Sequence, residues 1–561
     1  MVQCAGKTQY CRKCAACAGC QSYCAGTEPG CHGVTTCSQL KAAVANASCS
    51  SITIPCGTIM QPCFGISVTR SVTIKGEASC TSGSCKQQTT KHYHKPPGNT
   101  PSQPCNKPVI MGIGAGVNTT NREAIFTIDS TNSSSAIVVL LQGLVLANHS
   151  TTGEFLRLPF MLMNEFHLAA GINVMSLAAG PLGFDTGGFK LALRDMEFKN
   201  LTGGGGAMAV KAEASAVNTN APSDLVIHGC KFVSCKASGW EGAGAVFVHL
   251  VAGPVHILNS SFVQNSGLIY GAVAINTVGV QRDMAASVRI QGSSFVENSS
   301  NFVSGVFMES IFAREAVVSS CRFVSNVGIG LYFKNRLLLE WGDTEAKLTA
   351  SQLAFQGNVN PWLSFEDHYP GGMFFWGPQL CLSDALFAGN IGRAAGALEV
   401  AAAKFTGSRI TFESNSANRP TGPEWDDRPA RGMADTLKIF SVGFDTALSF
   451  GINSNSVLSG CSFQRNASTP NDVADIHVLE EKYGGNTQLY LCPSSFGAGG
   501  MLLATTPAPN AGSLVGVGQP SIQICGDQQS GKDYTKKPGS NVFAFDAAAC
   551  AAKCSNTAGT C

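Results

Sequence analysis

Residues Ser261-Phe-Val-Gln-Asn265-Ser-Gly-Leu-Ile-Tyr-Gly271-Ala-Val-Ala-Ile275 contain two phrases that recur along the chain and decide its fold. The first is Phe-x-x-Asn, found at Phe262/Asn265, Phe295/Asn298, Phe323/Asn326, Phe355/Asn358, Phe387/Asn390, Phe412/Asn415 and Phe463/Asn466. The second begins with glycine, at Gly206-Ala-Met-Ala-Val, Gly244-Ala-Val-Phe-Val, Gly271-Ala-Val-Ala-Ile, Gly305-Val-Phe-Met, Gly372-Met-Phe-Phe and Gly396-Ala-Leu-Glu-Val. A period of about 30 residues is typical of a solenoid, in which no single repeat buries its own apolar face.

The segments between these phrases are short, rich in Val, Ile and Phe, and lack helical periodicity, so they predict a parallel β-helix. We expect the phenylalanines to form an inward column, because equivalent residues of successive rungs lie about 4.8 Å apart. Asparagine at a corner is expected to adopt a left-handed backbone and to bond the asparagines above and below. Glycine is expected at the other corner, where it permits positive φ.

Three mid-chain cysteines share one position in the repeat. Cys230, Cys321 and Cys461 each precede a phenylalanine by two residues, which predicts one interior position filled by buried apolar thiols. Cys230 and Cys321 are three rungs apart, or about 14 Å, beyond the reach of a disulfide. Cys235 stands where the phrase after Phe232 would have asparagine.

The pairing of Phe-x-x-Asn with Gly-Ala-(Val/Leu/Met) resembles the repeat of chlamydial polymorphic outer-membrane proteins, over about residues 190–480. That repeat belongs to the pectin-lyase-like superfamily, so the resemblance implies an all-β, right-handed parallel β-helix. Proteins with this repeat are surface passenger domains and adhesins. The resemblance therefore implies adhesion at a cell surface, and membrane attachment does not carry over.

Four segments are predicted along the chain. A Cys-rich disulfide segment spans 1–34, the β-helix spans 35–495, a linker spans 496–520 and a partial module spans 521–561. The β-helix is expected to begin with a short helix at 36–47, which resembles the N-terminal cap of pectin-lyase-like folds and closes the open end of the core. The last segment, with Cys550 and Cys554 on one face of a helical phrase, resembles the first half of a PAN/apple module, a kind that binds carbohydrate or protein.

The 24 cysteines are too many for an ordinary cytosolic protein and indicate an oxidising compartment. The disulfide candidates are Cys4, Cys11, Cys14, Cys17, Cys20, Cys24, Cys31, Cys37, Cys525, Cys550, Cys554 and Cys561. The spacing from Cys14 to Cys24 also fits an iron–sulfur loop or a zinc site, although its Ala, Gly and Ser neighbours favour a small disulfide module. N-glycosylation candidates are Asn46, Asn118, Asn132, Asn148, Asn200, Asn259, Asn298 and Asn466.

The charge composition excludes several partners. Charged residues make up 13% of the chain and the net charge is +2, which argues against a nucleic-acid partner or an anionic membrane surface. No apolar run is long enough to span a bilayer, and no signal peptide is visible. Because the chain ends on Cys561 within a cysteine-spaced segment, we expect a fragment, and the cysteines favour an extracellular or cell-surface protein. We expect no cofactor and no metal, since His92 and His94 fit a solvated loop better than a metal site.

Candidate catalytic residues were sought because many right-handed β-helices cleave polysaccharides. The densest charged and aromatic cluster lies at 424–431, where the adjacent Asp426 and Asp427 resemble the paired aspartates of polygalacturonases. The other motifs of those enzymes are missing or out of order. The segment 365–368, with His368, loosely resembles a pectate lyase phrase whose calcium-binding aspartates and arginine base are not matched. Candidate ligand-binding residues in the first cluster are Glu424, Trp425, Arg428 and Arg431.

Two function classes follow from these observations. The favoured one is a non-enzymatic secreted or cell-surface β-helix that acts as an adhesin, cell-wall or matrix component. Its expected partner is a polysaccharide or a cell-surface or matrix protein. The alternative is a polysaccharide lyase or glycoside hydrolase with its site near the 424–431 loop.

Overall fold

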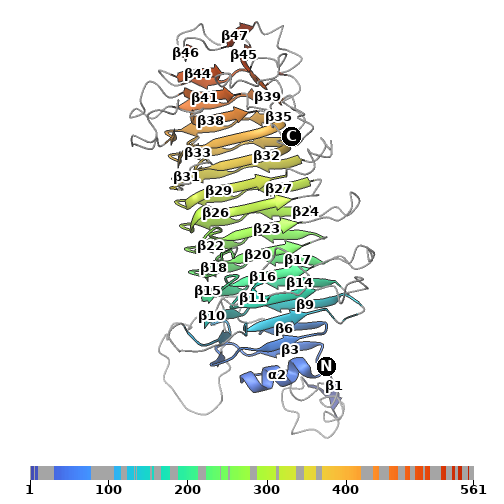
Figure 1. Cartoon of the computed structure of the whole chain (residues 1–561). Helices are drawn as coiled ribbons and strands as arrows, with labels where there is room; N and C mark the ends of the chain where they lie inside the picture. The colour runs from blue at the N-terminus through green and yellow to red at the C-terminus, as the bar shows by residue number, and fades with distance from the viewer. Residues whose placement is uncertain are drawn as a thin grey trace, which may run out of the picture.

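The computed structural model describes residues 2–4, 7–9, 31–77, 106–114, 123–131, 133, 135–151, 155–156, 166–176, 188–212, 223–240, 242–250, 253–277, 287–310, 315–335, 347–361, 369–393, 395–417, 434–440, 454–464, 474–479, 487–496, 500–505, 520–525, 534–536, 541–545 and 554. These residues form a long stack of rungs whose neighbouring strands are parallel (Figure 1). The expected all-β parallel β-helix is confirmed. Each complete rung contributes one strand to each of three faces, which we call the first, second and third sheets.

The first sheet carries the strands that precede the phenylalanines. They are β3 (Ser51–Ile54), β6 (Val72–Gly76), β9 (Ile137–Gln142), β14 (Phe189–Arg194), β17 (Asp224–His228), β21 (Val255–Leu258), β24 (Ser287–Gln291), β27 (Glu315–Ser319), β30 (Lys347–Ser351), β39 (Ser454–Ser459), β42 (Thr487–Leu491), β45 (Ser521–Cys525) and β47 (Val542–Phe545). Their inward residues alternate with outward ones, as in β17, where Leu225 and Ile227 are buried.

The second sheet carries the phenylalanines. Its strands are β4 (Ile59–Met60), β7 (Val109–Met111), β10 (Val145–Ser150), β15 (Glu197–Gly203), β18 (Lys231–Val233), β22 (Ser261–Val263), β25 (Ser294–Val296), β28 (Arg322–Val324), β31 (Ala354–Gln356), β33 (Leu386–Ala388), β36 (Thr411–Glu413), β40 (Ser462–Gln464) and β43 (Ser495–Phe496), with β19 (Lys236–Ala237) paired beside β15. Most are very short, because a turn follows almost immediately.

The third sheet carries the glycine phrases. Its strands are β5 (Ile66–Val68), β8 (Phe126–Asp129), β13 (Ile172–Ser176), β16 (Met208–Ala212), β20 (Val246–Leu250), β23 (Val273–Thr277), β26 (Ser299–Ser310), β29 (Val327–Lys334), β38 (Ala434–Phe440), β41 (Ala474–Leu479), β44 (Gly500–Thr505) and β46 (Tyr534–Lys536). Two long strands, β32 (Met373–Ser383) and β35 (Leu398–Ser408), run from the third sheet into the first.

Three small pairings lie outside these faces. The strands β1 (Val2–Cys4) and β2 (Lys7–Gln9) are antiparallel, as are β11 (Phe155–Leu156) and β12 (Phe166–His167). The short strands β34 (Ile391–Gly392) and β37 (Ser416–Ala417) are parallel and follow the second sheet at its edge with the third.

The phenylalanines form the inward column that the sequence predicts. From Phe198 to Phe496 successive ring centroids lie 4.4–5.2 Å apart, with the ring planes within 17° of parallel. In the earlier rungs the same register position holds Met60, Ile110 and Leu146. The column therefore changes from aliphatic to aromatic within one continuous core.

A buried asparagine ladder follows the phenylalanine column. In each step from Asn265 through Asn298, Asn326, Asn358 and Asn390 to Asn415, the backbone N–H and the Nδ2 of one asparagine donate to the Oδ1 of the next. Each Nδ2 also donates to the carbonyl of the phenylalanine one rung earlier. The predicted side-chain ladder is therefore confirmed.

Cys235 continues this ladder with different chemistry. Its backbone N–H donates to Asn265 Oδ1 at 3.0 Å, and its thiol donates to the carbonyl of Phe198 at 3.6 Å. The thiol thus occupies the place that an amide Nδ2 has in later rungs, as a weaker donor.

Two details of the corners differ from the prediction. The left-handed backbone falls one residue before the asparagine, at Gln264 (φ 55°), Glu297 (φ 54°) and Ser325 (φ 52°), because the asparagine itself must point inward to meet its neighbours. Among the phrase glycines Gly206 has positive φ, whereas Gly305 is required by close packing. A Cβ added at Gly305 would collide with the backbone carbonyl of Gly330 and would lie 2.8 Å from Phe323 Cδ1, so glycine allows close approach to the next rung and to the aromatic column.

A helix closes the N-terminal end of the stack (Figure 1). The helix α2 (Cys37–Ala45) begins with a capping box between Thr36 and Gln39 and buries Leu40, Ala43 and Val44 against the first rung, as the sequence predicts. Disulfides join Cys31 to Cys49 and Cys37 to Cys63.

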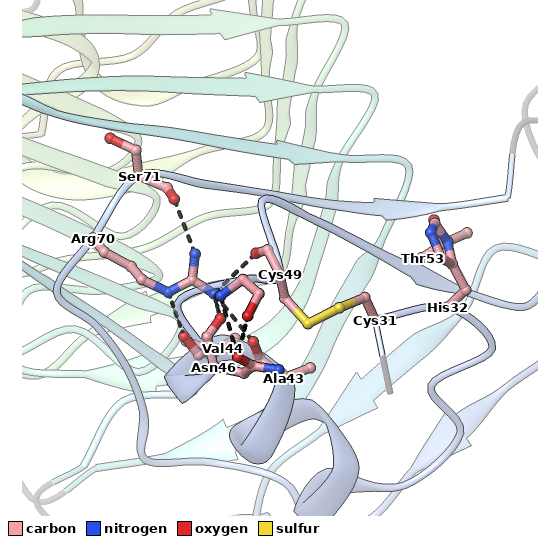
Figure 2. Close-up of a disulfide and its surroundings, with 10 residues drawn as sticks. Cys31, His32, Ala43, Val44, Asn46, Cys49, Thr53, Arg70 and Ser71 are labelled. Carbon is pink, nitrogen blue, oxygen red and sulfur yellow. Dashed lines mark hydrogen bonds between the residues drawn. A yellow bond between two sulfur atoms is a disulfide. The ribbon is translucent and has the colours of Figure 1, made fainter. Parts of the chain in front are cut away.

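Arg70 stabilises the carboxyl end of this helix, as Figure 2 shows. Its guanidinium donates to the carbonyls of Ala43, Val44, Asn46 and Cys49, at 2.6–3.1 Å, and to the carbonyl of Ser71 at 3.2 Å. A cation is favourable here because the last helical carbonyls lack intrahelical donors.

The β-helix extends beyond both predicted boundaries, at 35 and 495. Cys31 and Val34 are buried in the core, and His32 forms a bridge with Thr53. At the other end β44, β45, β46 and β47 continue the first and third sheets through the range predicted as linker and module. Those rungs lack the Phe-x-x-Asn phrase after Phe496, which is why the repeat alone placed the end too early.

Cys230, Cys321 and Cys461 are buried free thiols, as predicted, and so is Cys235, whereas Cys381 in β32 is disulfide-bonded. Burial raises the pKa of Cys230 and Cys235 to about 12 and that of Cys321 and Cys461 to about 11. Thiols of this kind are poor nucleophiles and serve as core packing.

Candidate functional site

All the residues predicted for catalysis or ligand binding lie outside the described residues. They are His368, Glu424, Trp425, Asp426, Asp427, Arg428 and Arg431. The described residues that flank their two segments can be placed. Both segments connect the second sheet to the third, the first leading into β32 and the second into β38. They therefore leave from the same edge of the β-helix, two rungs apart.

The outer side of the third sheet next to this edge carries two rows of large side chains. In β20, β23, β26, β29 and β32 every second residue faces outward, because the residues between them fill the core. One row, the aromatic row, contains Phe247, Ala274, Phe307, Tyr332 and Phe374. The second, the polar row, contains His249, Asn276, Glu309, Lys334 and Trp376.

The aromatic row is packed as a small second core. The rings of Phe307, Tyr332 and Phe374 stack at centroid distances of 5.2 and 4.8 Å. Phe302 meets Tyr332 edge-on at 5.1 Å, and Tyr369 meets Phe374 edge-on at 5.2 Å. The three stacked rings are 3–6% exposed, while Phe302 and Tyr369 are half-buried. The surface available to a partner is therefore made by the flanking rings.

The polar row pairs opposite charges beside an indole. Lys334 Nζ lies 3.2 Å from Glu309 Oε1 and 6.0 Å from the centroid of the Trp376 ring. Trp376 is half-buried, so part of its ring remains accessible. Burial and the neighbouring charge of Lys211 lower the pKa of His249 to about 4, so this histidine is neutral at physiological pH.

The aromatic row continues into buried ionisable residues. In β35, β38 and β41 the same register position holds Glu399, Lys438 and His477. Lys438 Nζ lies 3.0 Å from Glu399 Oε1, and the two side chains are 8% and 4% exposed. His477 is 3% exposed and sits beside Lys438 on the next strand. A carboxylate, an amine and an imidazole thus occupy successive positions of one row on β35, β38 and β41, and the 424–431 segment leads into the middle one of these strands.

Sequence reasoning missed both rows. The outward Phe247 lies between the inward Val246 and Val248, and Phe307, Tyr332 and Phe374 likewise have apolar neighbours on both sides, so alternation does not distinguish outward aromatics from core residues. The informative pattern runs from one repeat to the next rather than along a single strand. Two residues after Gly305, Gly330 and Gly372, large rings recur in successive repeats at Phe307, Tyr332 and Phe374.

Only some of the cysteines predicted to form disulfides lie within the described residues. Cys31, Cys37, Cys525 and Cys554 are disulfide-bonded, with Cys31–Cys49, Cys37–Cys63 and Cys492–Cys554 as pairs. Cys49, Cys63 and Cys492 are partners that the prediction omitted. Cys4 lies in β1, and Cys11, Cys14, Cys17, Cys20, Cys24, Cys550 and Cys561 lie outside the described residues.

One cysteine group has metal-like spacing in the described part of the chain. The Sγ atoms of Cys492, Cys525 and Cys554 lie within 4.8 Å of one another. All three are disulfide-bonded, so they offer no thiolate to a metal. His92 and His94 lie outside the described residues.

The predicted glycosylation sequons differ in exposure. Asn46, Asn200 and Asn259 are exposed and Asn148 is half-buried, whereas Asn118, Asn132 and Asn466 lie outside the described residues. Asn298 is fully buried, and its amide belongs to the asparagine ladder. Asn298 therefore cannot carry a glycan in the folded protein, and that candidate is corrected.

Across the described ranges, no helix is long and apolar enough to cross a membrane. A comparison with known proteins found no matching family model, no matching curated protein and no matching solved structure.

Proposed function

We propose that the chain is a non-enzymatic secreted or cell-surface β-helix that binds a glycan on the outer side of its third sheet. The observation that carries this proposal is the pair of in-register rows, aromatic and polar, on β20 to β32. The half-buried rings of Phe302, Tyr369 and Trp376, which flank the buried stacked rings, offer apolar surface to sugar rings. The polar row beside them offers amide and charged groups for hydrogen bonds to hydroxyls. The rows repeat along the axis of the β-helix, which favours a linear polymer as the ligand.

The disulfides support the extracellular part of the proposal. They join residues at both ends of the β-helix, and such bonds persist in oxidising environments. A long stack of rungs whose N-terminal end is closed by a helix suits an adhesin or a component of a cell wall or matrix.

The proposal is tested by retention of the purified protein on a panel of acidic and neutral polysaccharides. Trp376→Ala is expected to weaken binding about fivefold, because one aromatic stacking contact is worth about 1 kcal/mol. Trp240→Ala is the matched control, since Trp240 is 62% exposed and lies outside both rows. Equal losses in the two variants, or no retention on any polysaccharide, would count against the proposed surface.

A second candidate function is polysaccharide cleavage. It is favoured by the buried set of Glu399, Lys438 and His477 beside the strand into which the 424–431 segment leads. The same panel distinguishes the two functions when soluble products are measured with and without calcium. Products that disappear in both Asp427→Ala and Glu399→Gln, in folded protein, would establish an enzyme and overturn the non-enzymatic proposal.

A further inference from the structure

The sequon Asn46-Ala47-Ser48 lies on the exposed side of the N-terminal cap, directly after α2. All three residues are exposed. Asn46 is also the C-cap residue of the helix, and Figure 2 shows it beside Arg70 and the Cys31–Cys49 disulfide. An oligosaccharide on its side chain would therefore project into solvent at the closed end of the stack.

The side chain of Asn46 is held in a defined geometry by Ser48. Asn46 Oδ1 accepts a hydrogen bond from the Ser48 backbone N–H at 3.1 Å and another from the Ser48 hydroxyl at 3.1 Å. Both bonds span two residues, so this turn can form without the rest of the fold. It is available when the nascent chain meets a glycosyltransferase.

This geometry matches the chemistry of N-glycosylation. In the reaction Nδ2 attacks C1 of a lipid-linked oligosaccharide diphosphate, the N–C1 bond forms, and the C1–O bond breaks. The lipid diphosphate leaves with the electron pair, and Nδ2 loses a proton to a base of the transferase. The product is a neutral amide, and the two donors from Ser48 act by holding the orientation of the Asn46 amide.

The backbone around the sequon is fixed as well. The carbonyl of Asn46 accepts a hydrogen bond from Arg70 Nη2 at 2.6 Å and another from the Cys49 N–H at 3.0 Å. The disulfide from Cys49 to Cys31 ties the next turn to the first rung. A glycan at this position would leave the core contacts of the cap unchanged.

The other described sequons lack this arrangement. Asn200 Nδ2 donates to Asn148 Oδ1 at 3.2 Å across adjacent rungs, which engages the side chains of two sequons at once. Asn259 Nδ2 lies 3.4 Å from His228 Nε2. Asn298 is buried in the asparagine ladder.

We propose that Asn46 is an N-glycosylation site and that Ser48 determines its use by positioning the Asn46 amide. The inference goes beyond the proposed function, because it concerns modification of the cap rather than the ligand of the third sheet. It is tested in the full chain expressed behind a cleavable secretion leader in eukaryotic cells. Its outcome is thus independent of polysaccharide binding and of where the native chain resides.

Site occupancy is measured by peptide mapping after enzymatic glycan release in heavy-oxygen water, which converts a glycosylated asparagine into a labelled aspartate. We expect the label at Asn46, loss of the label in Ser48→Ala, and retention of the label in Ser48→Thr. Asn259→Gln, at an exposed sequon outside the asparagine ladder, serves as a control that leaves the glycan at Asn46 unchanged. Secreted protein with an unlabelled Asn46 would overturn the inference, and so would full labelling in Ser48→Ala.

Discussion

The N-terminal cap and the middle rungs are held in place by different interactions. In the cap two disulfides, a capped helix and the five hydrogen bonds of Arg70 hold the first rung in place. From Phe198 to Phe463 the rungs are held mainly by stacked rings and, over most of that length, by an amide ladder. Four cysteines there, Cys230, Cys235, Cys321 and Cys461, remain free thiols, and Cys381 in β32 is disulfide-bonded.

The difference follows from the number of neighbours. A middle rung has a rung on each side, so its phenylalanine ring stacks on two neighbouring rings and its asparagine forms hydrogen bonds to two neighbouring rungs. The first rung has a neighbour on one side alone, and its open end would expose apolar residues and unpaired backbone groups. Covalent bonds and a helix replace the missing neighbour. Stability in the middle is thus cooperative along the axis, whereas stability at the cap is local.

The largest expected effect breaks the middle column. Phe323→Ala is expected to lower the free energy of unfolding by about 3–5 kcal/mol, because it removes a buried ring that stacks on Phe295 and Phe355. Chemical denaturation measures the change. The neighbouring Val324→Ala is the control, because Val324 is half-buried on the outward side. A loss of unfolding free energy below about 0.5 kcal/mol for Phe323→Ala would show that the column does not stabilise the middle rungs.

Removing a cross-link is expected to affect the cap alone. The double variant Cys31→Ser and Cys49→Ser should lower stability by about 3 kcal/mol, because the disulfide closes a loop with a sequence separation of 18. Hydrogen exchange should report lost protection in β3 and α2, with protection in β28 unchanged. Lost protection throughout the middle rungs would contradict the local character of the cap.

Cutting the amide ladder is expected to have an intermediate effect. Asn326→Ala leaves the backbone N–H and the Nδ2 of Asn298 without their acceptor, and a buried unsatisfied donor costs about 1–3 kcal/mol. Arg322→Ala, an exposed position on the same rung, is the control. If both variants unfold at the same denaturant concentration, the ladder adds nothing beyond the rings.

The smallest expected effect is a pH dependence at the third rung. Burial lowers the pKa of His149, whose Nδ1 accepts the Ile113 N–H at 3.1 Å while Nε2 meets the carbonyl of Glu123 at 2.7 Å. The folded state therefore favours the neutral imidazole of His149. The contribution of the neutral imidazole is present above the unfolded pKa of about 6.5 and is lost as pH falls toward the lowered folded value. His149→Gln should flatten the stability profile between pH 7.5 and 5, and an unchanged profile would contradict this assignment.

The middle of the molecule was predictable from sequence, because one vertical column imposes one residue type on every rung. Phe323, Asn326 and Cys321 each follow from the repeat alone. The left-handed backbone at Ser325 does not follow from the repeat. Serine has no preference for that conformation, and the equivalent position in the next repeat is a different residue, Gly357.

The outer face and the two ends were less predictable. Tyr332 and Phe333 are adjacent aromatics of which one faces outward and one inward, and sequence does not distinguish them without the register of neighbouring strands. At the C-terminal end β45 and β47 pair without the phenylalanine phrase. The pairing of Cys492 with Cys554 depends on chain reversal over 62 residues, which no local pattern encodes.

The four buried thiols impose an order on biosynthesis. In an oxidising compartment any exposed thiol is open to mispairing, and the unfolded chain offers all 24 cysteines at once. Burial protects four thiols from mispairing only after their rungs have closed around them: Cys230, Cys235, Cys321 and Cys461. Assembly of the middle rungs therefore competes in time with oxidation, and a chain that stacks slowly would become trapped in non-native cross-links. The speed of rung addition, as much as the stability of the finished rod, decides the yield of correctly bonded protein.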